Sequence, residues 1–172
     1  MDDLNDALAR DLDGSFGAVV TGMGPQLFWG LRRMCGSHQE AEDLTQETFI
    51  RAYRALSGYE PGRIEEIALR PWLWTIAMNL GRNHVRDRSR RPTYVELTVE
   101  TGAEDPDPVD SAAWDRRLAS LTRAQRDAVV LRHVVGMSIA EISEATGRPE
   151  GTVKADVHRG LARLREAMEV EV

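Results

Sequence analysis

Residues 136–165 of this 172-residue chain are expected to form two helices joined by a tight turn, the second of which carries basic side chains on its outer face. Ser138 and Glu141 have the spacing of a capping box at the start of the first helix, and Gly147 followed by Pro149 indicates a stop and a restart. In the second helix, valine and leucine recur at i, i+4, i+8 and i+11 and should face a core. This register leaves four polar side chains outside, namely Lys154, His158, Arg159 and Arg163.

The pattern is typical of a helix-turn-helix, whose second helix enters the major groove of DNA so that its early exposed residues meet base edges. The alternative is a helical hairpin whose charged face is only solvated. The hairpin alone does not decide between these two interpretations.

A second set of polar and aromatic residues lies on a helix that should begin at Pro71, where the missing N–H costs nothing. An aromatic ring can stack on an unpaired base for about 1–3 kcal/mol, an amide can read a base edge, and arginine can hold the backbone. Trp74 is interpreted as a core residue, whereas for Trp72 core packing and base stacking both remain open. The candidate residues of this set are Trp72, Asn79, Arg82, Asn83 and Arg86.

Catalysis and metal binding find no support in the sequence. The four histidines are scattered, no glycine-rich phosphate loop follows a strand, and no nucleophile lies beside a plausible base. The single cysteine, Cys35, has no partner at metal-ligand spacing, and packing is its expected role. We therefore expect a protein that is not an enzyme and that needs neither a cofactor nor a metal.

The net charge of −6 is acidic, but the charge is unevenly distributed. Residues 96–110 contain six carboxylates and no lysine or arginine, whereas residues 82–91 are rich in arginine. Phosphate binding depends on the local field, so an acidic total does not exclude a nucleic-acid partner. No apolar run is long enough to span a bilayer and the N-terminus carries no secretion signal, so we expect a cytoplasmic protein without membrane insertion.

The acidic segment divides the chain, because it is rich in proline and carboxylates and shows no sustained helical period. The expected fold is all-α, with two small helical domains joined by an extended acidic linker: residues 1–92, residues 93–111 and residues 112–172. Within the first domain we expect a helix over residues 16–34 with a break or kink near Pro25, and a loop over residues 58–70. Between them we expect a helix over residues 40–56, capped by Ser37, with one apolar side formed by Ala41, Leu44, Thr48, Ala52 and Ala55.

Four motifs in this order resemble those of bacterial extracytoplasmic-function (ECF) RNA polymerase sigma factors. They are AEDLTQETFIRAYRAL at residues 41–56, RPWLWTIAMNL with its arginine-rich tail at residues 70–80, LTRAQR at residues 121–126, and GTVK at residues 151–154. The resemblance covers nearly the whole chain and implies two helical domains called region 2 and region 4. It also implies a transcription initiation factor that binds core RNA polymerase and directs it to specific promoters. An anti-sigma factor is a further partner that the resemblance leaves open.

The resemblance implies a role for each set of residues. The surface that grips the clamp helices of the polymerase would consist of Asp43, Gln46, Glu47, Arg51 and Arg54. The melted minus-ten strand would be held by Trp72, Asn79, Arg82, Asn83 and Arg86, with residues 58–70 capturing a flipped base. The minus-thirty-five duplex would be read by Lys154, Ala155, His158, Arg159 and Arg163. The linker carboxylates would either mimic nucleic acid or serve as a solvated spacer.

One residue departs from the family pattern. Asp156 stands where many relatives carry a cation, so we expect either a weaker phosphate grip or a carboxylate that accepts from a cytosine amino group. The rival function is a free-standing helix-turn-helix regulator, which would leave the face of Trp72 and Asn79 without a purpose. Binding to core polymerase distinguishes the two functions.

Overall fold

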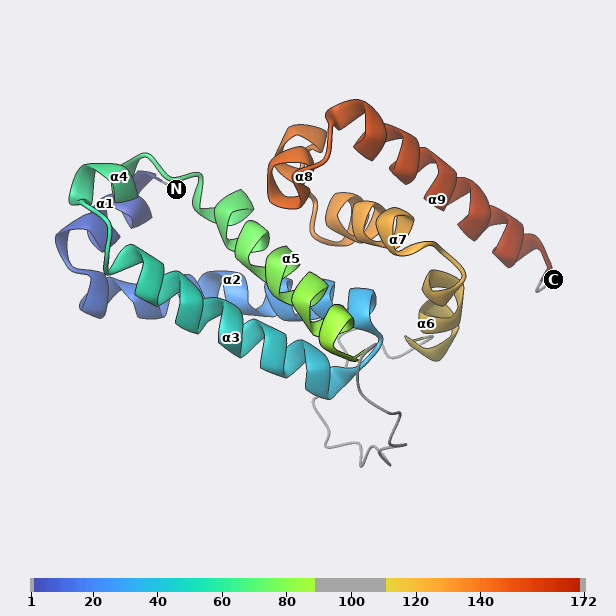
Figure 1. The fold of residues 1–172 in the computed structure, drawn as a ribbon, viewed down its shortest axis with the longest axis horizontal. Coiled ribbons are helices and arrows are strands. Elements are labelled where there is room, and N and C mark those ends of the chain that lie inside the picture. Colours follow the sequence, from blue (N-terminus) through green and yellow to red (C-terminus); the bar gives the residue numbers. More distant parts are fainter. Residues whose placement is uncertain (1, 89–110, 171–172) are drawn as a thin grey trace.

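A computed structural model of the chain describes residues 2–88 and 111–170 (Figure 1). Within these two segments every regular element is a helix, so the predicted all-α fold is confirmed. The predicted acidic linker lies almost entirely outside the described residues.

The N-terminal half is built around three long helices, with two shorter helices at one end (Figure 1). Its elements are α1 (Asp2–Arg10), α2 (Leu12–Cys35), α3 (His38–Leu56), α4 (Pro61–Glu65) and α5 (Leu69–Arg88). Helix α3 packs against both α2 and α5, while α1 packs against α4. Four of the five residues predicted to line one side of α3 are buried, namely Ala41, Leu44, Thr48 and Ala52, and the fifth, Ala55, is half-buried.

The boundaries of these helices differ from the predictions in four places. Of the expected break or kink near Pro25, the break is absent, because α2 is continuous through that residue. Thr21, whose carbonyl would have bonded to the missing N–H, is exposed and can bond to water instead, and packing against α3 supports the helix. The predicted loop contains α4, α5 begins at Leu69 ahead of Pro71, and α1 was not predicted.

The C-terminal half consists of shorter helices packed against one long helix. Its elements are α6 (Ser111–Ala119), α7 (Arg123–Val129), the π-helical turn η1 (Val130–Val134), α8 (Ile139–Thr146) and α9 (Glu150–Val170). Helix α9 lies close against α7 at Gly160, where an added Cβ would come within 2.6 Å of the Val129 side chain. A capping box between Thr122 and Gln125 starts α7.

The two halves are in direct contact. The Nε2 of Gln26 in α2 donates to the carbonyl oxygen of Val135, 2.8 Å away, just after η1. Arg32 in α2 pairs with Asp115 in α6 at 2.8 Å. Gly30 permits this approach, since an added Cβ would lie 2.6 Å from the Trp74 ring and 2.9 Å from Val135. The buried apolar residues of the halves therefore form one cluster, and we call this packing the closed arrangement.

Candidate nucleic-acid interface

Helices α8 and α9 form the predicted helix-turn-helix. Ser138 Oγ accepts from the Glu141 N–H at 3.2 Å, and a Glu141 carboxylate oxygen accepts from the Ser138 N–H at 2.7 Å, which completes the capping box. That backbone hydrogen bond holds the pKa of Glu141 below its usual value. Gly147 ends α8 with a left-handed φ of 67°, a conformation that favours glycine. The capping box and the glycine stop are therefore confirmed.

The outer face of α9 carries the predicted cations. Lys154 and Arg159 are well exposed, with 64% and 58% of their side-chain surfaces accessible. His158 and Arg163 are also exposed, whereas Ala155 is half-buried. Lys154 is 3.7 Å from Glu150 one turn earlier, an exposed ion pair of little strength. These side chains are accessible along the first two thirds of the helix, but their contact with DNA stays a prediction.

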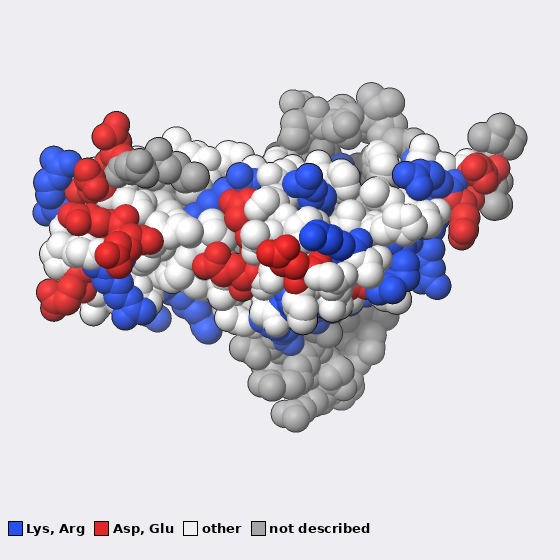
Figure 2. Space-filling view, turned by 90° about the horizontal axis from the view of Figure 1, so that it is seen from above, with Lys and Arg blue, Asp and Glu red and all other residues white. Residues whose placement is uncertain are grey.

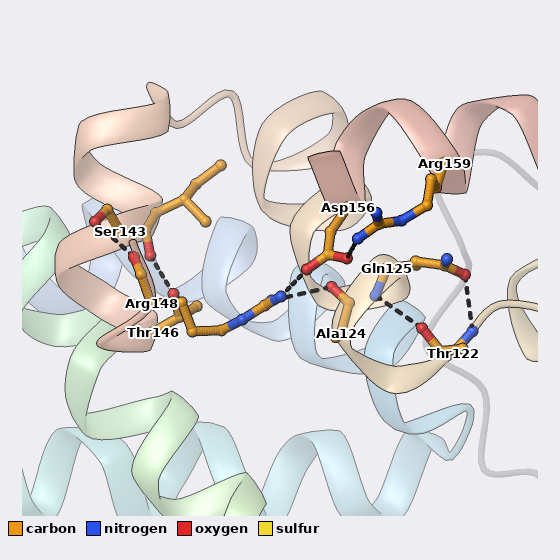
Figure 3. Close-up of polar contacts among 9 residues, drawn as sticks. Thr122, Ala124, Gln125, Ser143, Thr146, Arg148, Asp156 and Arg159 are labelled. Atoms are coloured by element: carbon orange, nitrogen blue, oxygen red, sulfur yellow. Dashed lines mark hydrogen bonds and ion pairs between the residues drawn. The ribbon is translucent and has the colours of Figure 1, made fainter. Parts of the chain in front are cut away.

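Asp156 does not face outward, which argues against the expected contact with a cytosine amino group, whereas the alternative, a weaker phosphate grip, stays a prediction. The residue is 5% exposed and lies on the inner side of α9, where it forms ion pairs with Arg148 and Arg159 (Figure 3). A buried carboxylate is tolerated because these two guanidinium groups pair with it. The helical register accounts for its place, since Asp156 lies three residues after the buried Val153.

The second candidate surface lies along α5. Trp74 is 2% exposed and belongs to the core, as predicted. Trp72 is half-buried and packs against Tyr59, with ring centroids 6.3 Å apart. The Arg63 guanidinium lies over the Tyr59 ring, 3.8 Å from its centroid. The sequence prediction missed the stack of Tyr59 and Arg63, which lies on the segment expected to capture a flipped base.

Asn79 and Arg82 are exposed neighbours on α5. Arg82 Nη2 donates to Asn79 Oδ1 at 2.5 Å, and Arg82 Nη1 is 3.4 Å from the carbonyl oxygen of Thr146 in α8. The backbone of Asn83 and Arg86 continues α5, but their side chains lie outside the described residues. In the closed arrangement, Arg82 thus connects the candidate single-strand surface to the helix-turn-helix.

The predicted polymerase face lies along α3. Asp43, Gln46, Arg51 and Arg54 are exposed, and Glu47 is half-buried. Arg51 donates to Glu47 at 2.6 Å across one helical turn. The sequence prediction missed an apolar groove between α2 and α3, in which Phe28, Phe49 and Ile50 lie beside Asp43 and Gln46. Only the proximity of the two helices creates this groove.

Opposite charges are interspersed over the surface in Figure 2, and acidic side chains gather at the end that carries α1 and α4.

One carboxylate has a strongly shifted pKa: burial raises the pKa of Asp127 in α7 to about 6, although Arg123 and Arg126 act to lower it. Burial likewise raises the pKa of the Cys35 thiol to about 11, which keeps it protonated and agrees with a packing role.

The described residues contain no cluster of side chains that could hold a metal ion. Within the same segments, no helix has the length and apolar character needed to cross a membrane.

Comparison with known proteins identifies the family. The sigma-70 region 2 family matches residues 19–91, and the sigma-70 region 4 family matches residues 111–164. ECF RNA polymerase sigma factor SigF of Caulobacter vibrioides is 34% identical over 167 residues, covering 94% of this chain and 91% of SigF. The chain belongs to the ECF sigma factors. ECF RNA polymerase sigma factor SigE of Mycolicibacterium smegmatis is 38% identical over 144 residues, or 78% of this chain. The matched part spans only 54% of the length of SigE.

A solved relative shares the fold. The sigma factor RpoE of Bartonella quintana, in a co-crystal structure with the anti-sigma factor NepR, has a TM-score of 0.76 and 26% identity, covering 91% of this chain and 98% of RpoE. As an ECF sigma factor, the chain is a transcription initiation factor and not an enzyme. Its partners are core RNA polymerase and promoter DNA, so the free-standing regulator is not favoured.

Proposed function

We propose that this sigma factor reads its promoter with two separate surfaces and docks on polymerase with a third. The exposed face of α9 reads the minus-thirty-five duplex, through Lys154, Ala155, His158, Arg159 and Arg163. Helix α5 holds the melted minus-ten strand, through Trp72, Asn79, Arg82, Asn83 and Arg86. The face of α3 docks on the polymerase clamp helices, through Asp43, Gln46, Glu47, Arg51 and Arg54.

The observation that carries this proposal is the clustering of cations on the accessible side of α9, directly after a capped helix and a glycine stop. In a helix-turn-helix, that side of the second helix enters the major groove. Phosphate contacts by arginine and lysine position such a helix, and contacts to base edges give it specificity. Helix α5 adds an exposed amide and a half-buried tryptophan, which suit unpaired bases.

The test is reconstitution with bacterial core RNA polymerase. The full chain should form a complex with core enzyme and select promoters from a library randomised at the minus-ten and minus-thirty-five elements. Polymerase binding without selection at either element would contradict the two DNA-reading surfaces. Selection of DNA by the chain alone, without polymerase, would instead favour a free-standing regulator.

We also propose that an anti-sigma factor binds the chain, because the similar RpoE was solved in complex with one. The same cytoplasmic compartment would then hold the factor, its inhibitor and polymerase. Such an inhibitor should compete with core polymerase for the chain, and simultaneous binding of both would contradict this part of the proposal.

A further inference from the structure

A buried carboxylate connects two arginines of the helix-turn-helix. One oxygen of Asp156 accepts from Arg159 Nη2 at 2.8 Å, and the other pairs with Arg148 (Figure 3). The Asp156 side chain is only 7% exposed, whereas that of Arg159 is 58% exposed. The carboxylate therefore lies beneath the surface of α9 and holds a side chain that projects from it.

Arg148 in turn fixes the turn before α9. Its carbonyl oxygen accepts from Ser143 Oγ in α8 at 2.7 Å, and its Nη1 is 3.4 Å from the carbonyl oxygen of Ala124 in α7 (Figure 3). Through Asp156, Arg148 is also bound to α9. The carboxylate that holds Arg159 is thus itself tied, through Arg148, to α7 and α8, whereas a solvated carboxylate would have no such support.

We propose that Asp156 is a positioning residue that sets how Arg159 reads the minus-thirty-five element. This inference rests on the proposed role of α9. A free arginine loses rotamer freedom when it binds, and an arginine already held by a carboxylate loses less. The negative charge also offsets part of the guanidinium charge, which weakens its attraction to phosphates of any sequence. Asp156 therefore favours reading of one base pair over non-specific binding.

The alternative is that Asp156 serves only to pair with Arg148 and hold the turn. Asp156→Asn alone does not separate the two roles, because it leaves the partly buried Arg148 without its charge partner and can destabilise the domain. The variant Arg148→Gln with Asp156→Asn removes both charges of that pair. Arg148→Gln alone is its matched control, because it keeps Asp156 on Arg159. The difference between these two variants isolates the contact between Asp156 and Arg159.

The experiment uses the full chain with core RNA polymerase and a duplex library randomised at the minus-thirty-five element, with melting temperature recorded for each variant. Arg159→Ala should reduce discrimination at one base pair by about tenfold or more. Relative to its control, the double variant should reduce discrimination about three- to tenfold at that same base pair and nowhere else. Its binding to non-specific duplex should strengthen, and the salt slope should steepen by up to about one.

Adding Arg159→Ala to the double variant should abolish the steeper slope and leave the discrimination at the level of Arg159→Ala alone. A merely structural role would weaken specific and non-specific binding together. One contrary result is equal discrimination and equal salt slopes for the double variant and its control, while Arg159→Ala is still less selective than wild type. That result would overturn the positioning role of Asp156 but leave Arg159 as a base reader. Unchanged preference in Arg159→Ala would overturn the assignment of Arg159 as a base reader and the inference with it.

Discussion

Arg126 in α7 donates a hydrogen bond from Nη1 to the carbonyl oxygen of Met34, 3.0 Å away near the end of α2. The same guanidinium donates from Nε to the carbonyl oxygen of Leu118 at 2.9 Å. One side chain of region 4 therefore binds the C-terminal end of a region 2 helix, where a cation is also favoured by the helix dipole.

Loss of this contact should loosen the closed arrangement. We expect Arg126→Met to lower the free energy of unfolding by about 2 kcal/mol, because hydrogen bonds from a charged donor are lost and buried carbonyls are left unpaired. Small-angle scattering should show a larger radius of gyration than for wild type. Arg165→Met, at an exposed position of α9, is the control and should change neither quantity. An unchanged radius for Arg126→Met would contradict a role in closure.

Charge reversal on α3 should prevent polymerase docking. Gln46→Ala combined with Glu47→Arg should abolish association with core enzyme, because a reversed interfacial charge costs several kcal/mol. The change also places a cation next to Arg51, the present partner of Glu47. Circular dichroism should show intact helicity, and Glu169→Arg at an exposed site on α9 should bind core enzyme normally. Normal core binding by the double variant would reject this docking face.

Strand opening should depend on the exposed face of α5. Asn79→Ala and Trp72→Ala should permit a closed promoter complex but suppress permanganate reactivity at the minus-ten element, because they remove contacts that exist only with unpaired bases. Asn79→Ala is the cleaner variant, since Trp72 also packs against Tyr59. Thr21→Ala, at an exposed site on α2, serves as the control. Wild-type permanganate reactivity in Asn79→Ala would mean that Asn79 does not contact the unpaired strand.

Arg163 should contact the DNA backbone and not a base. Arg163→Ala should weaken binding to all sequences alike and lower the salt slope by about one, while the preferred minus-thirty-five sequence stays the same. Holoenzyme binding measured over a range of salt concentrations, with promoter selection alongside, checks both outcomes. A changed base preference would instead make Arg163 a base reader, like the role assigned to Arg159.

The buried carboxyl of Asp127 should make stability depend on pH. Its pKa is about 6 in the folded chain and near 3.8 when unfolded, so the folded state binds more protons between these values. Its contribution to stability is therefore complete below about pH 4 and is lost as the pH rises through about 6. Asp127→Asn should gain about 2–3 kcal/mol relative to wild type between pH 4 and pH 7. Thermal unfolding of both proteins across this range checks the trend, and a constant difference would contradict it.

Structural features that are set by residues within one or two helical turns could be predicted from the sequence. The Ser138 capping box, the Gly147 stop and the buried stripe of α3 depend on neighbours within one or two turns, and all are confirmed. The inward place of Asp156 follows from the helical register, but the outward expectation had been set by comparison with relatives. A register counted from Val153 would have found it.

Features that depend on distant contacts could not be predicted in the same way. The continuity of α2 through Pro25 depends on packing against α3, and the apolar groove exists only because those two helices meet. Likewise, nothing near Arg82 in the sequence indicates that its guanidinium reaches Thr146. For the same reason, the DNA and polymerase roles of the exposed residues stay predictions until a complex is measured.

The contact of Arg82 with Thr146 has a consequence for reach along DNA. The minus-ten and minus-thirty-five elements are separated by about 25 base pairs, or roughly 85 Å of duplex at about 3.4 Å per base pair. In the closed arrangement, Arg82 of the proposed minus-ten surface is 3.4 Å from Thr146 in α8, the helix that precedes the proposed recognition helix. In this arrangement the two candidate surfaces lie too close together to touch both elements at once. We therefore expect the closed arrangement to open on core polymerase, which would hold the two surfaces apart. The spacing that a promoter must have would then be a property of the complex and not of this chain.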